Sequence, residues 1–219
     1  MAKFKAVIFD LDGTLLDTLK DLAQSMNRVL DRNGLPLHPE DRYRYFVGDG
    51  ASTLVRRAVP EEVRKDEEAL ERLHKQFLQD YAKHWDSNTR LYPGISGMLD
   101  QLSSKDLKLA VLSNKPHEFT KLCVDRFLDK WNFDLVLGDR PGIPRKPDPA
   151  SAIEIAETFG VAPKSCLYLG DTSIDMTTAT RARMFPVGVL WGFRDRQELE
   201  DSGAKAIVAK PQEVLELLG

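Results

Sequence analysis

The sequence contains little cysteine and no long hydrophobic run, and both absences narrow the class of protein. Only two of its 219 residues are cysteine, Cys123 and Cys166, and they form no C-x-x-C pair. Two isolated thiols in a chain of this size indicate a reducing compartment. No stretch approaches the ~18 apolar residues of a membrane-spanning helix, and the apolar residues 6–9 are followed at once by acidic ones rather than by a secretory pattern. We therefore expect a cytoplasmic protein that binds no membrane.

The chain also lacks an excess of charge and the short motifs of several enzyme classes. Its 31 Lys and Arg residues nearly balance its 34 Asp and Glu residues, for a formal net charge of −3, which argues against a nucleic-acid partner. It has no G-x-x-x-x-G-K-[ST] phosphate loop and no G-x-S-x-G element, and its four histidines form no H-E-x-x-H or H-x-H pair. P-loop enzymes, serine hydrolases and zinc hydrolases are therefore disfavoured.

What the sequence does contain is an alternation of short apolar runs with helix-like segments. Hydrophobic residues make up 42% of the chain, enough for a sizeable core. The runs lie at residues 4–9, 108–112, 134–137, 166–169, 185–189 and 206–208. Strands that are apolar on both faces and separated by helices are typical of a parallel sheet covered by helices. We therefore predict an α/β fold with a doubly wound, Rossmann-like parallel-sheet core.

Residues 16–90 interrupt this alternation. Apolar residues recur there at three- and four-residue steps in two long stripes, and no convincing strand pattern is present. The alternation resumes after Tyr92-Pro93-Gly94. We therefore predict two domains, an α/β catalytic core of residues 1–15 and 91–219 and a small inserted α-helical cap of residues 16–90.

The motif at the end of the first predicted strand carries the clearest chemistry. Asp10 and Asp12 stand two residues apart and are followed by Gly13 and Thr14. Ligands bind at the carboxyl ends of strands in open parallel sheets, and alternate residues of an extended chain point the same way. Both carboxylates can therefore reach one cavity, and Gly13 permits an abrupt turn beside it. The pattern favours two functional carboxylates over a strand-end aspartate that only caps a helix.

A second acidic pair follows a later apolar run. Asp171 and Asp175 are four residues apart, so one helical turn would place them on the same side, although a helix cap with a surface acid would give the same spacing. Together with Asp10 and Asp12 they would bring up to four carboxylates to the strand ends, where they would repel one another. A hard divalent cation removes that conflict, and ligands that are all oxygen favour Mg²⁺ over Zn²⁺.

Two further segments offer groups that suit phosphate oxygens. Ser113 and Asn114 follow another apolar run with a hydroxyl, an amide and backbone N–H groups. Lys146 lies just before an expected helix start, and Pro147 and Pro149 would stiffen its approach. An ordinary turn and a solvated lysine would explain the same residues, so neither segment decides the function alone.

Taken together, these segments resemble the four ordered motifs of the haloacid dehalogenase superfamily. They are D-L-D-G-T at 10–14, S-N-K at 113–115, K-P-D-P at 146–149 and G-D-T-S-I-D at 170–175. The resemblance runs from residue 4 to the C-terminus, and the helical insertion is similar to the small cap of that superfamily. It implies a Mg²⁺-dependent hydrolase that acts on a small phosphorylated molecule.

The resemblance also implies a role for each residue of the first motif. Asp10 would attack phosphorus and become an aspartyl phosphate. Asp12 would protonate the leaving oxygen and later deprotonate the attacking water. Gly13 and Thr14 would support this loop, with Thr14 positioning Asp12.

The remaining motifs would hold the metal and the phosphate. The resemblance implies that Asp10, Asp171 and the main-chain carbonyl of Asp12 bind Mg²⁺, and that Asp175 supports the metal through water or orients the nearby lysine. The groups that would bind the phosphate oxygens are Ser113, Asn114 and Lys146.

Within the superfamily, the chain most resembles phosphoglycolate phosphatases. Residues 46–51, 170–176 and 187–194 carry that likeness. The chain departs from the subgroup at Arg183, where the subgroup usually has a glycine that ends a helix in a left-handed turn. We therefore expect Arg183 to cost stability or to shift the end of that helix.

The substrate stays open at this level. Phosphoglycolate is expected from the resemblance, but pyrophosphate and small sugar phosphates also fit, and a phosphosugar mutase would share the same aspartate pair. A halide-displacing enzyme would need only the nucleophile, and a phosphorylation-dependent receiver module would have no helical insertion after its first strand. The candidate contacts to the substrate from the cap are Gly48, Gly50, Arg44 and Arg56. Either a monomer or a homodimer would be compatible with the sequence.

Overall fold

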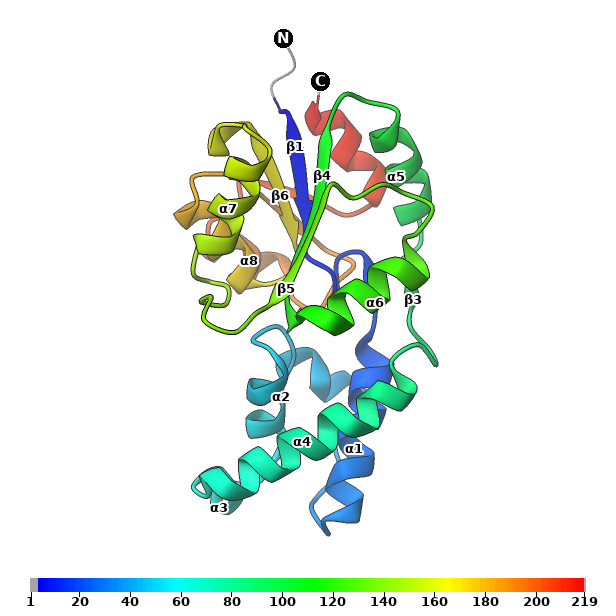
Figure 1. The fold of residues 1–219 in the computed structure, drawn as a ribbon, viewed down its shortest axis with the longest axis vertical. Coiled ribbons are helices and arrows are strands. Elements are labelled where there is room, and N and C mark those ends of the chain that lie inside the picture. Colours follow the sequence, from blue (N-terminus) through cyan, green and yellow to red (C-terminus); the bar gives the residue numbers. More distant parts are fainter. Residues whose placement is uncertain (1–3, 219) are drawn as a thin grey trace. The chain divides into compact units, whose positions relative to one another are not determined.

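The computed structural model describes residues 4–218, which fold into an α/β part and a helical part (Figure 1). The chain divides into two compact units, one of Met1–Leu16 with Leu91–Gly219 and one of Asp17–Arg90. Two short strands, β2 (Leu16–Asp17) and β3 (Arg90–Leu91), pair with each other where the chain passes from one unit to the other. The assignment of the second unit as a cap stays a prediction.

Six parallel strands form the sheet of the first unit, in the order β5-β4-β1-β6-β7-β8. They are β1 (Ala6–Phe9), β4 (Lys108–Pro116), β5 (Leu135–Asp139), β6 (Cys166–Gly170), β7 (Phe185–Val189) and β8 (Ala206–Val208). The predicted doubly wound α/β fold is confirmed, and each apolar run forms a strand. The central strands β1 and β6 are buried along their whole length, which explains why their sequences are apolar on both faces.

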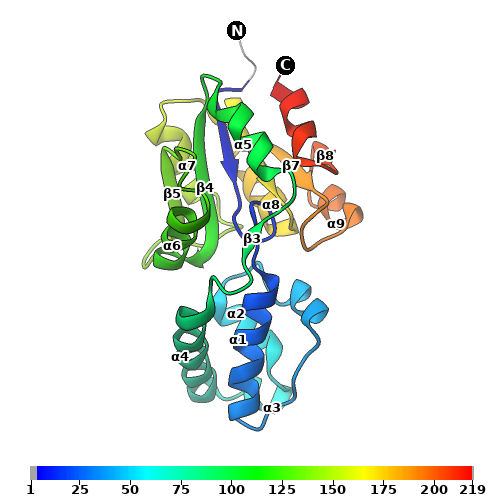
Figure 2. The same cartoon turned by 90° about the vertical axis from the view of Figure 1, so that its right-hand side faces the viewer.

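Helices cover both faces of this sheet. They are α5 (Ile95–Ser103), α6 (His117–Phe127), α7 (Ala150–Thr158), α8 (Ser173–Arg181) and α9 (Arg196–Asp201), with the 3-10 helices η2 (Pro163–Ser165) and η3 (Pro211–Leu218). Figure 1 shows α5, α6 and η3 on one side of the sheet and α7 and α8 on the other. In Figure 2, β8, α9 and η3 lie together at one edge. One hydrophobic cluster joins Ala6 and Ile8 to Ile155 of α7 and Ala179 of α8.

Strand β4 is longer than its apolar run indicates. The run ends at Leu112, but the strand continues to Pro116, which pairs with Asp139 of β5 after a shift in register. The polar residues 113–115 hide this extension from a search for apolar runs. They are nevertheless buried, so the end of β4 carries polar side chains into the interior.

The second unit is a small bundle of helices. They are α1 (Leu19–Arg32), η1 (Glu40–Tyr45), α2 (Ala51–Ala58), α3 (Glu61–Arg64) and α4 (Glu67–His84). Helices α1 and α2 both pack against α4, and the rings of Phe77 and Tyr81 stack in the interior with centroids 5.8 Å apart. The buried carboxylate of Asp80 accepts hydrogen bonds from Arg28 at 2.8 Å and Arg32 at 2.7 Å, which ties α4 to α1. Among residues 4–218, no helix combines the length and apolar character needed to cross a membrane.

Candidate active site

The carboxyl ends of neighbouring strands bring the four motifs together. Strand β1 lies between β4 and β6. Asp10 directly follows β1, Asp171 directly follows β6, and Ser113 lies near the end of β4. Lys146 comes from the loop between β5 and α7. This is the edge at which open parallel sheets bind ligands. The structure therefore places the four sequence motifs at one site.

Lys146 is the centre of the hydrogen-bond network. Its Nζ donates to Asp10 Oδ1 at 2.8 Å, to Asp175 Oδ1 at 2.7 Å and to the carbonyl oxygen of Leu112 at 3.1 Å, and its side chain is only 3% exposed. Burial alone would lower the pKa of Lys146, but the negative charges of Asp10 and Asp175 raise it well above its usual value. Lys146 therefore remains an ammonium group that bridges two buried carboxylates.

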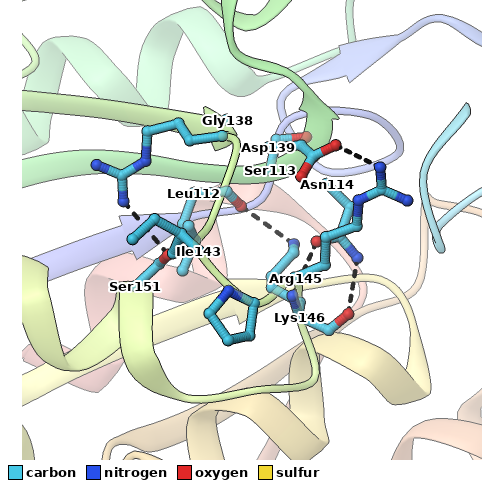
Figure 3. Close-up of a pocket in the computed structure, with 11 residues that line it drawn as sticks. Leu112, Ser113, Asn114, Gly138, Asp139, Ile143, Arg145, Lys146 and Ser151 are labelled. Atoms are coloured by element: carbon cyan, nitrogen blue, oxygen red, sulfur yellow. Dashed lines mark hydrogen bonds and ion pairs between the residues drawn. The ribbon is translucent and has the colours of Figure 1, made fainter.

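The amide of Asn114 holds the backbone of Lys146. Its Nδ2 donates to the Lys146 carbonyl oxygen at 2.9 Å, and its Oδ1 accepts from the Lys146 N–H at 2.9 Å, as Figure 3 shows. The two bonds show that Asn114 positions Lys146. Its expected role in binding phosphate oxygens stays a prediction. The hydroxyl of Ser113 accepts a hydrogen bond from the Lys115 N–H at 3.2 Å.

Asp171 is fully buried and is held on both of its oxygens. Oδ1 accepts from the Thr14 hydroxyl at 3.1 Å, and Oδ2 accepts from the Phe193 N–H at 2.8 Å. Thr14 therefore positions Asp171, not Asp12 as we predicted. Two glycines make room for the carboxylate: a Cβ at Gly13 would lie 2.3 Å from Asp171 Oδ2, and a Cβ at Gly192 would lie 2.3 Å from Asp171 Cβ.

The segment after β7 is a part of the site whose role the sequence did not reveal. Residues 191–193 supply the N–H to Asp171, and Trp191 Nε1 donates to the carbonyl oxygen of Thr14 at 2.9 Å. The W-G-F-R motif that carried the subgroup likeness thus connects β7 to the loop after β1. The bond from its indole explains Trp191, and the closeness of Asp171 explains Gly192.

Asp175 has a structural partner of its own at the start of α8. Its Oδ2 accepts from the Thr172 N–H at 3.1 Å and from the Thr172 hydroxyl at 2.6 Å, in a capping box. Oδ1 remains on Lys146. Asp175 therefore orients the lysine and also closes the capping box of the helix. The alternative of a helix cap with a surface acid is wrong, because the N-cap is Thr172 and Asp175 is buried.

Asp12 lies against a residue that the sequence analysis left without a role. Lys115 Nζ donates to Asp12 Oδ1 at 3.0 Å and to Oδ2 at 3.2 Å. A usable signal was present, because Lys115 is two residues from Ser113 and alternate residues of a strand share a face. Three of the four site carboxylates therefore face a buried lysine: Asp10 and Asp175 face Lys146, and Asp12 faces Lys115. The fourth, Asp171, is held by Thr14 and the Phe193 N–H.

The electrostatics of the site favour an added cation. Burial raises the pKa of Asp10 to about 7, because the attraction of Lys146 offsets the lost hydration only in part. Burial, with the charges of Asp10 and Asp175, raises the pKa of Asp171 well above its usual value. Carboxylate oxygens of Asp10, Asp171 and Asp175 lie within 4.8 Å of one another. A buried, oxygen-only donor set with surplus negative charge fits a hard divalent cation.

The four candidate residues of the helical unit lie around η1 and α2. Gly48 and Gly50, in the loop between these helices, have φ angles of 114° and 88°. Arg56 donates to both carboxylate oxygens of Glu67 at 2.8 Å, and Arg44 lies 3.9 Å from Asp41. Their role in binding a substrate stays a prediction.

The fold and the site together place the chain among hydrolases with a Rossmann-like core and aspartates at the strand ends. A family model described as haloacid dehalogenase-like hydrolase matches residues 7–189. The chain belongs to this family, which confirms the resemblance that its motifs indicated.

Individual relatives extend over nearly the whole chain. A phosphoglycolate phosphatase from Aquifex aeolicus is 33% identical over 189 residues, 86% of each chain. One from Chromobacterium violaceum is 31% identical over 216 residues, 98% of this chain and 96% of the relative. A solved structure described as a predicted phosphoglycolate phosphatase from Haemophilus somnus covers 100% of both chains with a TM-score of 0.91 and 30% identity.

Proposed function

We propose that this chain is a Mg²⁺-dependent phosphatase that hydrolyses a small phosphomonoester, and that its substrate is phosphoglycolate. The observation that carries the proposal is the buried cluster in which Lys146 bridges Asp10 and Asp175 beside Asp171. The choice of phosphoglycolate is supported by the relatives that bear this name and that match 86% and 98% of the chain.

Asp10 is the nucleophile in this proposal. A bond forms between its carboxylate oxygen and phosphorus while the bond from phosphorus to the leaving oxygen breaks, which gives an aspartyl phosphate. The carboxyl group of Asp12 passes its proton to the leaving oxygen, and the alcohol departs. The Asp12 carboxylate then takes a proton from the water that attacks phosphorus. That attack releases inorganic phosphate and restores the Asp10 carboxylate.

The positive and hydrogen-bonding groups of the site bind the phosphoryl oxygens. The ammonium of Lys146 balances the charge on these oxygens in the transition state. The hydroxyl of Ser113 and the N–H groups at the end of β4 donate hydrogen bonds to them. Asn114 is the third proposed phosphate-binding residue, and it also holds the backbone of Lys146 through two hydrogen bonds of 2.9 Å.

The metal would be held by Asp10, Asp171 and the main-chain carbonyl of Asp12. Bound there, Mg²⁺ supplies positive charge that reduces the repulsion between the carboxylates and a phosphate dianion. Thr14 and Gly13 keep the Asp171 carboxylate in place, by a hydrogen bond of 3.1 Å and by the space beside a missing Cβ. Asp175 supports these metal ligands indirectly, through its hydrogen bond from Lys146.

The helical unit is the proposed source of substrate specificity. Gly48 and Gly50 would offer backbone N–H groups, and Arg44 or Arg56 a positive charge, to the carboxylate end of phosphoglycolate. Losing one charged contact costs about 1.5–3 kcal/mol, or tenfold or more in kcat/KM. Arg44→Ala and Arg56→Ala should therefore lower kcat/KM for phosphoglycolate and leave it unchanged for an aryl phosphate whose leaving group carries no charge.

The decisive experiment is a phosphatase assay over a panel of substrates with Mg²⁺ present. We expect phosphoglycolate to have a higher kcat/KM than pyrophosphate and sugar phosphates, and a large preference for either of the others would overturn the substrate assignment. Asp10→Asn should abolish turnover because an amide does not attack phosphorus. The control is Asp134→Asn, which removes a carboxylate paired with Lys108 in the same unit. Retention of about a tenth of the wild-type kcat by Asp10→Asn, an effect of only about 1.4 kcal/mol, would refute the nucleophile, provided mass spectrometry excludes deamidation.

A further inference from the structure

Lys115 holds the carboxylate of Asp12, and the proposed catalytic steps give this lysine no role. Its Nζ lies 3.0 Å from Oδ1 and 3.2 Å from Oδ2, so the ammonium faces both oxygens. The Lys115 side chain is 3% exposed and that of Asp12 is 17% exposed. Within residues 4–218, no other group forms a hydrogen bond with the Asp12 carboxylate. The direction of this carboxylate therefore depends on Lys115.

The backbone that carries Lys115 is fixed on both sides. Its N–H donates to the Ser113 hydroxyl at 3.2 Å, and its carbonyl oxygen accepts from the Thr120 hydroxyl at 3.1 Å. The neighbouring strand β5 approaches closely, since a Cβ at Gly138 would lie 2.7 Å from the Lys115 carbonyl oxygen. Lys115 thus starts from a rigid point at the end of β4.

The backbone of Asp12 is fixed as well. In the loop around it, the N–H groups of Leu15 and Leu16 donate to the Leu11 carbonyl oxygen at 3.0 Å, and the Gly13 N–H donates to the Leu16 carbonyl oxygen at 2.9 Å. This tight loop leaves the side-chain torsions as the main freedom of Asp12. The ion pair with Lys115 restricts those torsions, which is the kind of support that a proton donor needs to stay aligned with its acceptor.

We propose that Lys115 is a positioning residue for proton transfer: it holds the Asp12 carboxyl in the orientation that reaches the leaving oxygen. The inference rests on the proposed phosphatase function. As the Asp10 oxygen bonds to phosphorus and the phosphorus–leaving-oxygen bond breaks, the proton passes from Asp12 to the leaving oxygen. The Asp12 carboxylate that remains faces the Lys115 ammonium. Removing Lys115 would leave Asp12 free to rotate without changing the nucleophile or the phosphate contacts of Lys146.

The leaving group of the substrate provides the test. In p-nitrophenyl phosphate the p-nitrophenolate group leaves phosphorus without help from an acid, whereas an alkyl phosphate such as phosphoglycolate needs protonation of its leaving oxygen. General acid catalysis contributes about 10²–10⁴-fold, so Lys115→Met should lower kcat/KM for the alkyl ester by about 10²-fold and for the aryl ester by less than about threefold. We use kcat/KM because it reports the first chemical step regardless of the later hydrolysis of the intermediate.

Two comparisons separate positioning from a structural role. Lys108→Met removes a lysine at the other end of the same strand, where it pairs with Asp134 on the surface. This variant should leave kcat/KM unchanged for both esters. In a double-mutant cycle, Lys115→Met should add no further loss to Asp12→Asn, because its whole effect passes through Asp12. Circular dichroism and the Tm check the fold, and Lys115→Gln is assayed in the same way if the Met variant does not fold.

The possible results are distinct. The inference would be overturned if Lys115→Met lowered kcat/KM equally for both esters, or if its loss added to that of Asp12→Asn in the cycle. A raised KM with an unchanged kcat would also overturn it, because Lys115 would then bind the substrate directly. An Asp12→Asn variant without leaving-group dependence would overturn it too. If the wild type hydrolyses none of the esters, the proposed function itself fails. If the wild type is active and only Asp12→Asn discriminates between the esters, the function stands and the role of Lys115 fails.

Discussion

The end of α8 offers a test in which stability should rise when a side chain is removed. Arg183 has a φ of 59°, in the left-handed region that residues with a Cβ rarely adopt. Its N–H donates to the Thr180 carbonyl oxygen at 3.0 Å, and the Met184 N–H donates to the Ala179 carbonyl oxygen at 2.9 Å. These two bonds form a Schellman motif, in which glycine is preferred at the position of Arg183.

Arg183→Gly should raise the free energy of unfolding by about 1 kcal/mol. The left-handed backbone costs a residue with a Cβ roughly 1–2 kcal/mol. The greater freedom of glycine in the unfolded chain cancels roughly 0.4–1 kcal/mol of that gain. The Arg183 side chain is exposed and, in the described part of the chain, forms no hydrogen bond or ion pair, so no contact is lost. For a chain of this length, the expected rise in Tm is about 2–4 °C.

Helix α7 supplies the matched control. It ends in the same motif at Gly160, which has a φ of 64°, and a Cβ there would meet nothing within 4 Å. Gly160→Ala should therefore destabilise by about 1 kcal/mol through backbone strain alone. Scanning calorimetry and urea unfolding measure both variants against the wild type. If Arg183→Gly is neutral or destabilising while Gly160→Ala destabilises, the reasoning about the backbone at 183 is refuted.

Three further predictions concern the metal site and the helical unit. Gly192→Ala should weaken Mg²⁺ binding by about tenfold or more in isothermal titration calorimetry, because its Cβ would lie 2.3 Å from Asp171 Cβ; an unchanged affinity would contradict this. EDTA should abolish turnover and Mg²⁺ should restore it, while excess Ca²⁺ should inhibit because it prefers a looser shell of about 6–8 oxygens; full activity of metal-free protein would exclude the metal. Burial alone would raise the pKa of Asp80, but the hydrogen bonds and charges of Arg28 and Arg32 lower it below its ordinary value. The stability that Asp80 contributes is therefore complete above about pH 4 and is lost as the pH falls through the lowered folded-state pKa. Asp80→Asn should therefore reduce the fall in the free energy of unfolding between about pH 4 and lower pH. An unchanged pH dependence would contradict a stabilising role of the ion pairs with Arg28 and Arg32.

Some parts of the site could be predicted because they depend on the chain locally. The carboxyl end of a buried parallel strand is recognisable from an apolar run that stops at polar residues. Asp10 after β1 and Asp171 after β6 meet this condition, and the pairing of β1 with β6 then brings them to one edge of the sheet. The four-residue spacing of Asp175 was also informative, since the same carboxylate caps α8 and holds Lys146.

Other parts depend on contacts between residues far apart in the chain, and no local pattern reveals them. Thr14 is two residues from Asp12 but bonds to Asp171, because the loop after β1 turns its hydroxyl toward β6. The sequence predicts only a phosphate-binding role for Asn114, and it does not reveal that the amide also pairs with the backbone of Lys146, 32 residues away. The strands β2 and β3 have two residues each, too few for a periodicity to be visible.

The charges of the site connect the proposed metal, the proposed nucleophile and the two lysines. The four site carboxylates would carry −4 when all are ionised, and Lys115 and Lys146 carry +2, so the formal balance is −4 + 2 = −2. A buried site does not keep such a surplus uncompensated. Protonation is one remedy, and burial accordingly raises the pKa of Asp10 to about 7. That remedy removes the negative charge that would make the Asp10 carboxylate a nucleophile toward phosphorus. A divalent cation would supply the missing two charges and leave Asp10 ionised, so the same imbalance would account both for the proposed cation and for the proposed reactivity of the carboxylate beside it.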